Sequence, residues 1–145
     1  MIKRRPESVL VVVYTTCSKV LLLQRADDPD FWQSVTGSLE EDELPRQAAD
    51  RELFEETGLV CPSMIDCQTT NQYAIREDWL HRYPPGVTHN TEHVFLAPFT
   101  QVPEVKLAAD EHLSSVWLDA DLAQARLWSA TNRQALIDFV LPRLN

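Results

Sequence analysis

The stretch from Gly37 to Leu59, GSLEEDELPRQAADRELFEETGL, constrains the fold of this chain more than any other. Pro45 suits the first turn of a helix, where its missing N–H costs no hydrogen bond. Gly58 suits the residue just beyond a helix end, where a left-handed backbone is common. Most residues between them are good helix formers. The sequence therefore predicts a loop followed by a helix that ends before Gly58.

Three acidic residues share one face of this predicted helix. Glu52, Glu55 and Glu56 stand at i, i+3 and i+4, and side chains at this spacing are neighbours on a helix surface. Like charges so placed destabilise an isolated helix by about 0.2–0.5 kcal/mol per pair. A cation among the carboxylates would compensate them, and Mg²⁺ prefers oxygen ligands. The alternative for this face is an ordinary solvated acidic surface.

Length and composition predict one globular domain over residues 1–145. The chain is 44% hydrophobic and 24% charged, which allows a single buried core. The net charge of −9 argues against binding to nucleic acid polymers or anionic membranes, which need basic surfaces. Cys17, Cys61 and Cys67 form no Cys-x-x-Cys pair, which predicts reduced, buried thiols in a cytoplasmic protein. No apolar run is long enough to span a membrane, and the oligomeric state stays open.

Segments rich in β-branched residues predict strands on both sides of the helix. Ser8–Tyr14 and Lys19–Gln24 are expected to form a hairpin. Further strands are expected over residues 33–36, 59–61, 64–75, 93–97 and 111–118, with a loop over 77–91 and a connection over 100–110. A closing helix is expected over Ser129–Leu141, with Ser129 as its N-cap. Strands before, between and after two helices predict an α/β domain.

The spacing within the central stretch resembles the signature of the Nudix hydrolases. Gly37 is followed after five residues by Glu43, and after seven more by the run RELFEETGL. The resemblance implies the Nudix fold, a mixed β-sheet sandwiched between α-helices, in which this stretch forms a loop–helix–loop. It implies hydrolysis of a phosphoanhydride with Mg²⁺ as cofactor, which Mn²⁺ can replace. It also implies that Arg51 and Glu43 brace the loop as an ion pair.

The same resemblance implies a set of metal ligands. Glu52 and Glu56 are the expected direct ligands, and Glu55 is expected to bind the metal or to act through water. The carbonyl of Gly37 is expected to join them, because a glycine allows close approach. Glu55 and Glu56 are therefore predicted to be catalytic as well as metal-binding.

An acid from outside the signature is expected to complete the site. Glu111 follows a long connection and begins a predicted strand, so it can present a carboxylate at the mouth of the site. We predict it as a further metal ligand or as the general base. Asp110 is the second choice, and an ordinary surface acid is the alternative for both residues.

Few cations are available to hold phosphate groups. Arg4 and Arg25 are the preferred pair for substrate binding. Lys3, His81 and Arg82 are the other candidates. Each of these cations has a simpler alternative role as a solubilising surface charge.

Aromatic and hydroxyl side chains provide the remaining candidates for substrate binding. Tyr73 or Trp128 is predicted to stack on a planar ring system, although either residue could belong to the core. Thr36 and Ser129 are predicted to contact the substrate. Threonine and serine cap helices and stabilise turns more often than they bind ligands, which is the alternative for both.

Tracts outside the signature point to a substrate. DDPDFWQSVTGSLE, HRYPPGVTHNTEH and WSATNRQALIDFV resemble the branch of the Nudix family that acts on a pterin triphosphate in folate biosynthesis. This resemblance implies hydrolysis of 7,8-dihydroneopterin triphosphate to the monophosphate and pyrophosphate. One alternative is a pyrophosphohydrolase acting on dATP or damaged nucleotides, because purines and pterins are similar fused rings. Another is a non-catalytic nucleotide-binding protein, against which the intact acids argue.

Overall fold

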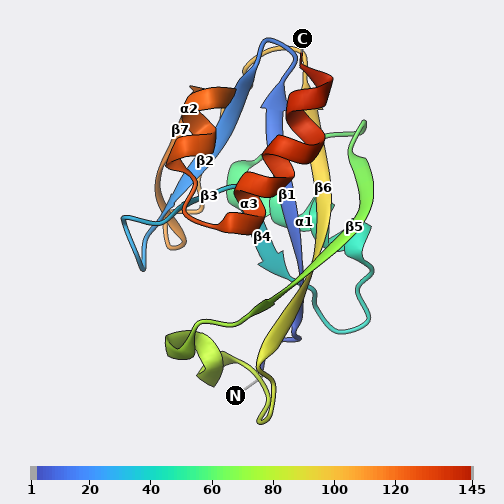
Figure 1. The fold of residues 1–145 in the computed structure, drawn as a ribbon, viewed down its shortest axis with the longest axis vertical. Helices are drawn as coiled ribbons and strands as arrows, with labels where there is room; N and C mark the ends of the chain where they lie inside the picture. Colours follow the sequence, from blue (N-terminus) through green and yellow to red (C-terminus); the bar gives the residue numbers. More distant parts are fainter. Residues whose placement is uncertain (1–2, 145) are drawn as a thin grey trace.

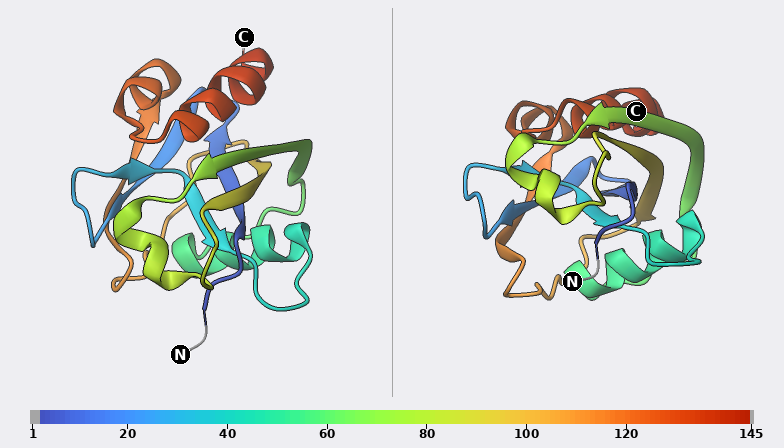
Figure 2. Two further views of the ribbon diagram at one scale, coloured as in Figure 1. Left: turned by 60° about the horizontal axis from the view of Figure 1, so that its bottom comes forward. Right: turned by 90° about the horizontal axis from the view of Figure 1, so that it is seen from below.

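A mixed β-sheet lies between two layers of helices in the computed structural model, which describes residues 3–144 (Figure 1). The strands are β1 Glu7–Thr15, β2 Lys19–Arg25, β3 Trp32–Gln33, β4 Val35–Ser38, β5 Ile65–Ala74, β6 His89–Phe99 and β7 His112–Asp119. The helices are α1 Pro45–Thr57, α2 Ala120–Arg126 and α3 Ala130–Ala135, with short helical turns η1 Glu77–Arg82, η2 Leu136–Val140 and η3 Leu141–Arg143. In both views of Figure 2, α1 lies on one side of the sheet and α2 and α3 on the other. The predicted α/β sandwich is confirmed.

Strand β1 is the centre of the sheet. The order is β3-β2-β1-β6-β5, with β4 also paired to β1 and β7 to β2. Among the strand pairs of residues 3–144, only β1 and β6 run parallel, and the predicted hairpin of β1 and β2 is present. β1 pairs with β2 at Tyr14↔Val20 and with β4 from Ser8↔Ser38 to Val11↔Val35. Because β1 changes partner along its length, β4 and its Gly37 lie beside the N-terminal half of β1.

Both faces of β1 are buried, because successive side chains of a strand point to opposite sides. Val9, Val11 and Val13 pack into the core on the α1 side. Leu10 and Val12 pack into the core beneath α2 and α3. A continuous apolar run is therefore what this doubly covered strand requires.

Helix α1 has the predicted boundaries. Pro45 is its first residue, and Gly58 follows its end with a φ of 73° and donates its N–H to the carbonyl of Phe54 at 2.8 Å. Ala49 and Leu53 are fully buried, so the face opposite the solvent anchors the helix on the sheet. The helix carries its acids at the edge of this buried face.

Three secondary-structure predictions were wrong. The segment 59–61 forms no strand, and the predicted loop 77–91 contains η1 and the start of β6. The predicted closing helix is α-helical only to Ala135 and continues as a π turn and a 3₁₀ turn. Pro142 lies in this last turn and lacks the N–H that an α-helix would need there.

Smaller features also differ from the predictions. Helix α2 was not predicted, although Asp119 before it and Asp121 in its first turn are typical of a helix start. Ser129 occupies the N-cap position of α3, but its hydroxyl lies 3.0 Å from that of Thr131 and caps no backbone N–H. The cysteines are free, as predicted, but only Cys61 of the three is buried: Cys17 is exposed and Cys67 is partly exposed. Within the described part of the chain, no helix has the length and apolarity needed to cross a bilayer.

Candidate active site

A cavity of about 640 Å³ opens beside the C-terminal part of α1, a size typical of small-molecule sites. Its walls come from β1, the end of β2, β3, β4, α1, β5, η1, β6, the start of β7 and the start of α3. The predicted site residues that line it are Arg4, Arg25, Thr36, Gly37, Glu52, Glu56, Tyr73, Arg82, Asp110, Glu111, Trp128 and Ser129. The structure therefore brings together almost all of them from distant parts of the chain. Glu55 is not among the lining residues.

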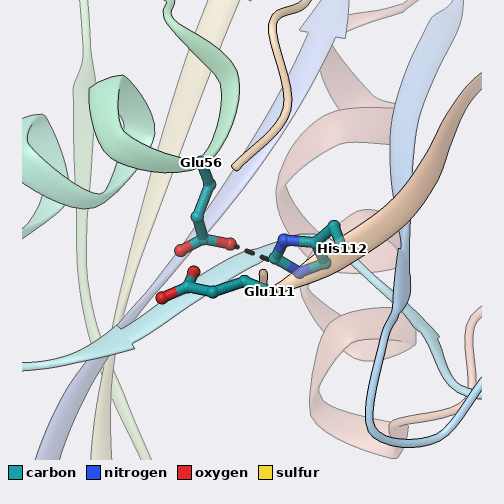
Figure 3. A group of neighbouring side chains, drawn as sticks. All are labelled: Glu56, Glu111 and His112. Atoms are coloured by element: carbon teal, nitrogen blue, oxygen red, sulfur yellow. Dashed lines mark ion pairs between the residues drawn. The ribbon is translucent and has the colours of Figure 1, made fainter. Parts of the chain in front are cut away.

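Glu56, Glu111 and His112 form a cluster of possible metal ligands at the cavity (Figure 3). One ligand atom from each residue lies within 4.8 Å of the other two. Glu56 comes from the last turn of α1 and is 1% exposed, and neither of its carboxylate oxygens has a hydrogen-bond partner. Burial, reinforced by the neighbouring carboxylate of Glu52, raises the pKa of Glu56 well above its usual value. Burial also raises the pKa of Glu111.

Glu52 lies directly against Gly37. A Cβ at position 37 would overlap the carboxyl carbon of Glu52, so a glycine is needed for this approach. Glu52 is itself 9% exposed and accepts a hydrogen bond from Arg51 at 2.7 Å. The contact places the Glu52 carboxylate beside the Gly37 backbone at the cavity wall.

Arg51 binds the loop and the helix together. Its guanidinium donates to both carboxylate oxygens of Glu43 at 2.8 Å each, so the predicted brace is confirmed. It also donates to the carbonyl of Ser38 at 3.0 Å and to Glu55 at 3.1 Å. The hydrogen bond from Arg51 is the main reason why the pKa of Glu43 is lowered. Glu55 is half-exposed and turned toward Arg51, which explains why it does not line the cavity.

Residues 4–139 match the NUDIX domain family. The chain belongs to the NUDIX family. It is 48% identical over 143 residues to the dihydroneopterin triphosphate diphosphatase of Escherichia coli (strain K12), which covers 95% of this chain and 94% of the relative. It is 41% identical over 135 residues to the Haemophilus influenzae protein of the same name, covering 90% and 84%. A solved structure of the E. coli dihydroneopterin triphosphate pyrophosphohydrolase has a TM-score of 0.91 and 46% identity, covering 98% of this chain and 99% of that one.

The NUDIX acids of this chain fit a divalent cation. The oxygens of Glu56 are buried and without partners, and such a carboxylate is costly unless a cation or hydrogen bonds compensate it. Glu52 and Glu111 provide further carboxylate oxygens at the same cavity, and hard divalent ions prefer oxygen ligands. The donor set therefore suits an ion of the Mg²⁺ type.

His112 was not predicted, and a chain of hydrogen bonds determines its state. Arg25 donates to Gln33 Oε1 at 3.3 Å, and Gln33 Nε2 lies 3.1 Å from His112 Nε2. Arginine can only donate, so the amide oxygen of Gln33 faces Arg25 and its NH₂ group faces the imidazole. His112 Nε2 is therefore an acceptor, and the proton lies on Nδ1.

The imidazole of His112 is also neutral. Burial, together with the charge of Arg25, lowers the pKa of His112 to about 4. The 3.6 Å between His112 Nε2 and Glu56 Oε1, dashed in Figure 3, is longer than a hydrogen bond. The neutral imidazole therefore gives the Glu56 carboxylate no counter-charge, so a bound cation would have to supply it.

Arginines and an indole ring form another wall of the cavity. The guanidinium carbons of Arg76, Arg25 and Arg82 lie 4.3, 4.7 and 5.2 Å from the ring centroid of Trp79. These distances are typical of cation–π contacts. Arg25 is also held by Asp27 at 2.7 Å, which orients its guanidinium. Arg76 and Trp79 were not predicted: Arg76 lies between the predicted strand 64–75 and the predicted loop 77–91, and Trp79 lies within that loop, where the turn η1 was not expected.

Of the remaining aromatic and cationic candidates, some line the cavity and others do not. Trp128 stacks on Phe31 with ring centroids 4.3 Å apart and remains half-exposed, so it does not belong to the core. Tyr73 lies at the cavity, and its hydroxyl oxygen accepts a hydrogen bond from Asn90 Nδ2 at 3.1 Å. Lys3 and His81 do not line the cavity, because the Lys3 ammonium is bonded to the carbonyl of His81 at 2.7 Å.

Proposed function

We propose that this chain is a metal-dependent pyrophosphohydrolase that converts 7,8-dihydroneopterin triphosphate to dihydroneopterin monophosphate and pyrophosphate. The observation that carries the proposal is the single cavity that joins the NUDIX acids to arginines, aromatic rings and buried polar groups. Relatives named for this activity are similar along almost the whole chain and not only in the NUDIX signature. A site that combines these groups suits a triphosphate attached to a planar ring.

Mg²⁺ is the proposed cofactor, and Mn²⁺ is expected to replace it. The proposed ligands are Glu52, Glu56, Glu111 and the carbonyl of Gly37. Glu55 reaches the site only through water, because it lies outside the cavity wall. When bound, a divalent cation neutralises charge on phosphate oxygens and lowers the pKa of water.

The protein side chains position the substrate for this chemistry. Arg4, Arg25, Arg76 and Arg82 line the cavity and are proposed to hold the phosphate groups. Their charge offsets the net negative charge of the protein at the place where an anionic substrate must bind. Glu111 is proposed as the general base, because it is exposed to the cavity beside Glu56. The free cysteines agree with a reducing compartment, and we propose the cytoplasm.

The test is product analysis with the purified chain and Mg²⁺. We expect dihydroneopterin monophosphate and pyrophosphate from 7,8-dihydroneopterin triphosphate, with a higher kcat/KM than for dATP or 8-oxo-dGTP. Release of orthophosphate without pyrophosphate would contradict the proposal, as would a higher kcat/KM for dATP. Mg²⁺ and Mn²⁺ should both restore activity after treatment with EDTA.

Glu56→Gln tests the metal assignment. Groups that only support metal ligands already contribute about 10–100-fold to activity, so we expect a loss of at least about 100-fold in kcat. Asp50→Asn is the matched control, because Asp50 lies on the same helix, is exposed, and pairs only with Arg46. Near-normal turnover of Glu56→Gln would show that Glu56 is not a ligand.

A further inference from the structure

A buried carboxylate in the cavity has no role in the chemistry described above. Glu92 of β6 is 2% exposed and lines the cavity. One of its oxygens accepts a hydrogen bond from the Asn71 amide at 3.3 Å. Among residues 3–144, no lysine, arginine or histidine forms an ion pair with it, and the neighbouring His93 pairs with Glu7 instead. The hydroxyl of Thr131 is the other polar group close to this carboxylate, and it is neutral like the amide of Asn71. A carboxylate buried without a counter-charge is costly, so Glu92 suits a ligand that donates N–H groups to it.

The position of Glu92 on its strand makes its polarity unexpected. Val94 and Leu96 stand on the same face of β6 and pack into the core beneath α2 and α3. Toward the start of the strand, the next residues on this face are Glu92 and then Asn90, which are both 2% exposed. A structural role alone would favour apolar side chains at these two positions. The face changes from apolar to polar where it reaches the cavity.

Asn90 beside it has an unused acceptor. Its Nδ2 donates to Ser8 Oγ at 2.7 Å and to the Tyr73 hydroxyl at 3.1 Å. Arranged in this way, its Oδ1 is buried and has no hydrogen-bond partner. Asn90 and Glu92 therefore present acceptor oxygens to the same cavity, and both require N–H or O–H donors from a ligand.

We propose that Glu92 recognises the 2-amino-4-oxo edge of the substrate ring by accepting two parallel N–H bonds, one from the ring N–H and one from the 2-amino group. A carboxylate accepts in this bidentate manner. A pterin carries this edge, and guanine carries the same pattern, whereas adenine has no ring N–H beside its amino group. The inference deepens the proposed function, on which it rests, by naming the residue that selects the ring.

The spacing of the strands agrees with this assignment. Ser8 of β1 stands in register with Glu92 of β6 on one side and with Ser38 of β4 on the other. Two strand spacings of about 4.8 Å separate Glu92 from Ser38, which follows Gly37. A ring bound at Glu92 can therefore extend its phosphate chain toward the NUDIX acids. Burial raises the pKa of Glu92, and two N–H donors from a ligand would replace the water that the carboxylate has lost.

Glu92→Gln tests the proposal, because glutamine keeps the shape but offers one acceptor and one donor. We expect kcat/KM for 7,8-dihydroneopterin triphosphate and for dGTP to fall about 10- to 100-fold, the usual effect of leaving one polar group unmatched. The value for dATP should change less than about 3-fold, since adenine does not use both acceptors. Glu7→Gln is the matched control, because Glu7 is a partly buried sheet carboxylate outside the cavity lining. Glu7→Gln should leave the ratios of kcat/KM between the substrates unchanged.

Binding of neopterin and adenosine, measured by calorimetry in EDTA, separates ring recognition from catalysis. Glu92→Gln should weaken the binding of neopterin and leave the binding of adenosine unchanged. A thermal unfolding transition of the variant would show that it is folded. An equal loss for all ligands and all substrates would overturn the inference, because it indicates a structural role. If wild-type protein releases no pyrophosphate from the pterin triphosphate, the proposed function fails. A loss of preference for dGTP over dATP in Glu92→Gln would still support ring selection by this carboxylate.

Discussion

Arg51 links the NUDIX loop to its helix, and removing its charge should destabilise the protein. Arg51→Met keeps most of the aliphatic stem and removes the guanidinium. Glu43 and Glu52 would then lose their counter-ion while their side chains are 11% and 12% exposed. Breaking a buried pair by removing one partner costs about 3–5 kcal/mol. Since Arg51 itself is 22% exposed, we expect the lower end, about 3 kcal/mol, in the free energy of unfolding.

A double-mutant cycle with Glu43→Gln isolates the pair itself. Hydrogen bonds to charged groups contribute about 1.5–3 kcal/mol, and we expect a coupling energy in this range at pH 7. Because the pKa of Glu43 is lowered in the folded protein, its contribution to stability is present above the ordinary value of 4.5. That contribution is lost as the pH falls through the lower folded-state pKa. The coupling energy should therefore shrink as the pH falls below 4.5.

Urea unfolding followed by tryptophan fluorescence in EDTA gives the required free energies. Arg46→Met is the control, because Arg46 lies on the same helix and makes an exposed pair with Asp50 at 3.3 Å. Such a surface pair contributes about 0.3–0.5 kcal/mol. A coupling energy between Arg51 and Glu43 within about 0.3 kcal/mol of zero would refute the argument. Equal costs for Arg51→Met and Arg46→Met would refute it too.

The packing also predicts the effect of one substitution, Gly37→Ala, and the reactivity of the cysteine thiols. Gly37→Ala should displace the Glu52 carboxylate and lower kcat at least about 10-fold, because even supporting groups at metal sites have effects of this size; unchanged kinetics would show that the contact is unimportant. Cys17 is exposed and should react with a chromogenic disulfide in the native protein, whereas Cys61 is buried, its pKa is raised by that burial, and it should stay unreactive until urea unfolds the chain. Rapid native labelling of every thiol would contradict the described burial.

The parts of the fold that were predictable are those whose structure is determined by residues within the same short segment. Pro45 and Gly58 determine the ends of α1 through their own backbone preferences, so their neighbours hardly matter. The buried strands β1 and β2 are apolar over most of their length, and a short apolar run bounded by turn residues favours a buried strand over a helix. Helix α2 has only seven residues, and short helices depend on packing that a sequence pattern does not contain.

The site was most directly predictable where its residues are close in sequence. The NUDIX acids and their brace lie within one stretch, and the structure places most of them at one cavity. Gln33 and His112 are 79 residues apart and meet only through the pairing of β2 with β3 and β7. Sequence also does not tell which of the neighbours Glu111 and His112 is buried. The structure buries His112 and leaves Glu111 exposed.

The proposed assignments place reaction and selectivity on different elements of this chain. The acids lie on α1 and at the start of β7, whereas Glu92 and Asn90 lie on β6 across β1 from the NUDIX loop. Strand β1 pairs with β4 of the NUDIX loop and with β6. A substitution on β6 can therefore change which substrate ring is preferred without moving the proposed metal ligands. Glu56→Gln should therefore lower kcat for every substrate alike, while Glu92→Gln should change the ratios between substrates. A NUDIX protein with intact acids but without the acceptors on β6 would share the reaction and differ in its substrate.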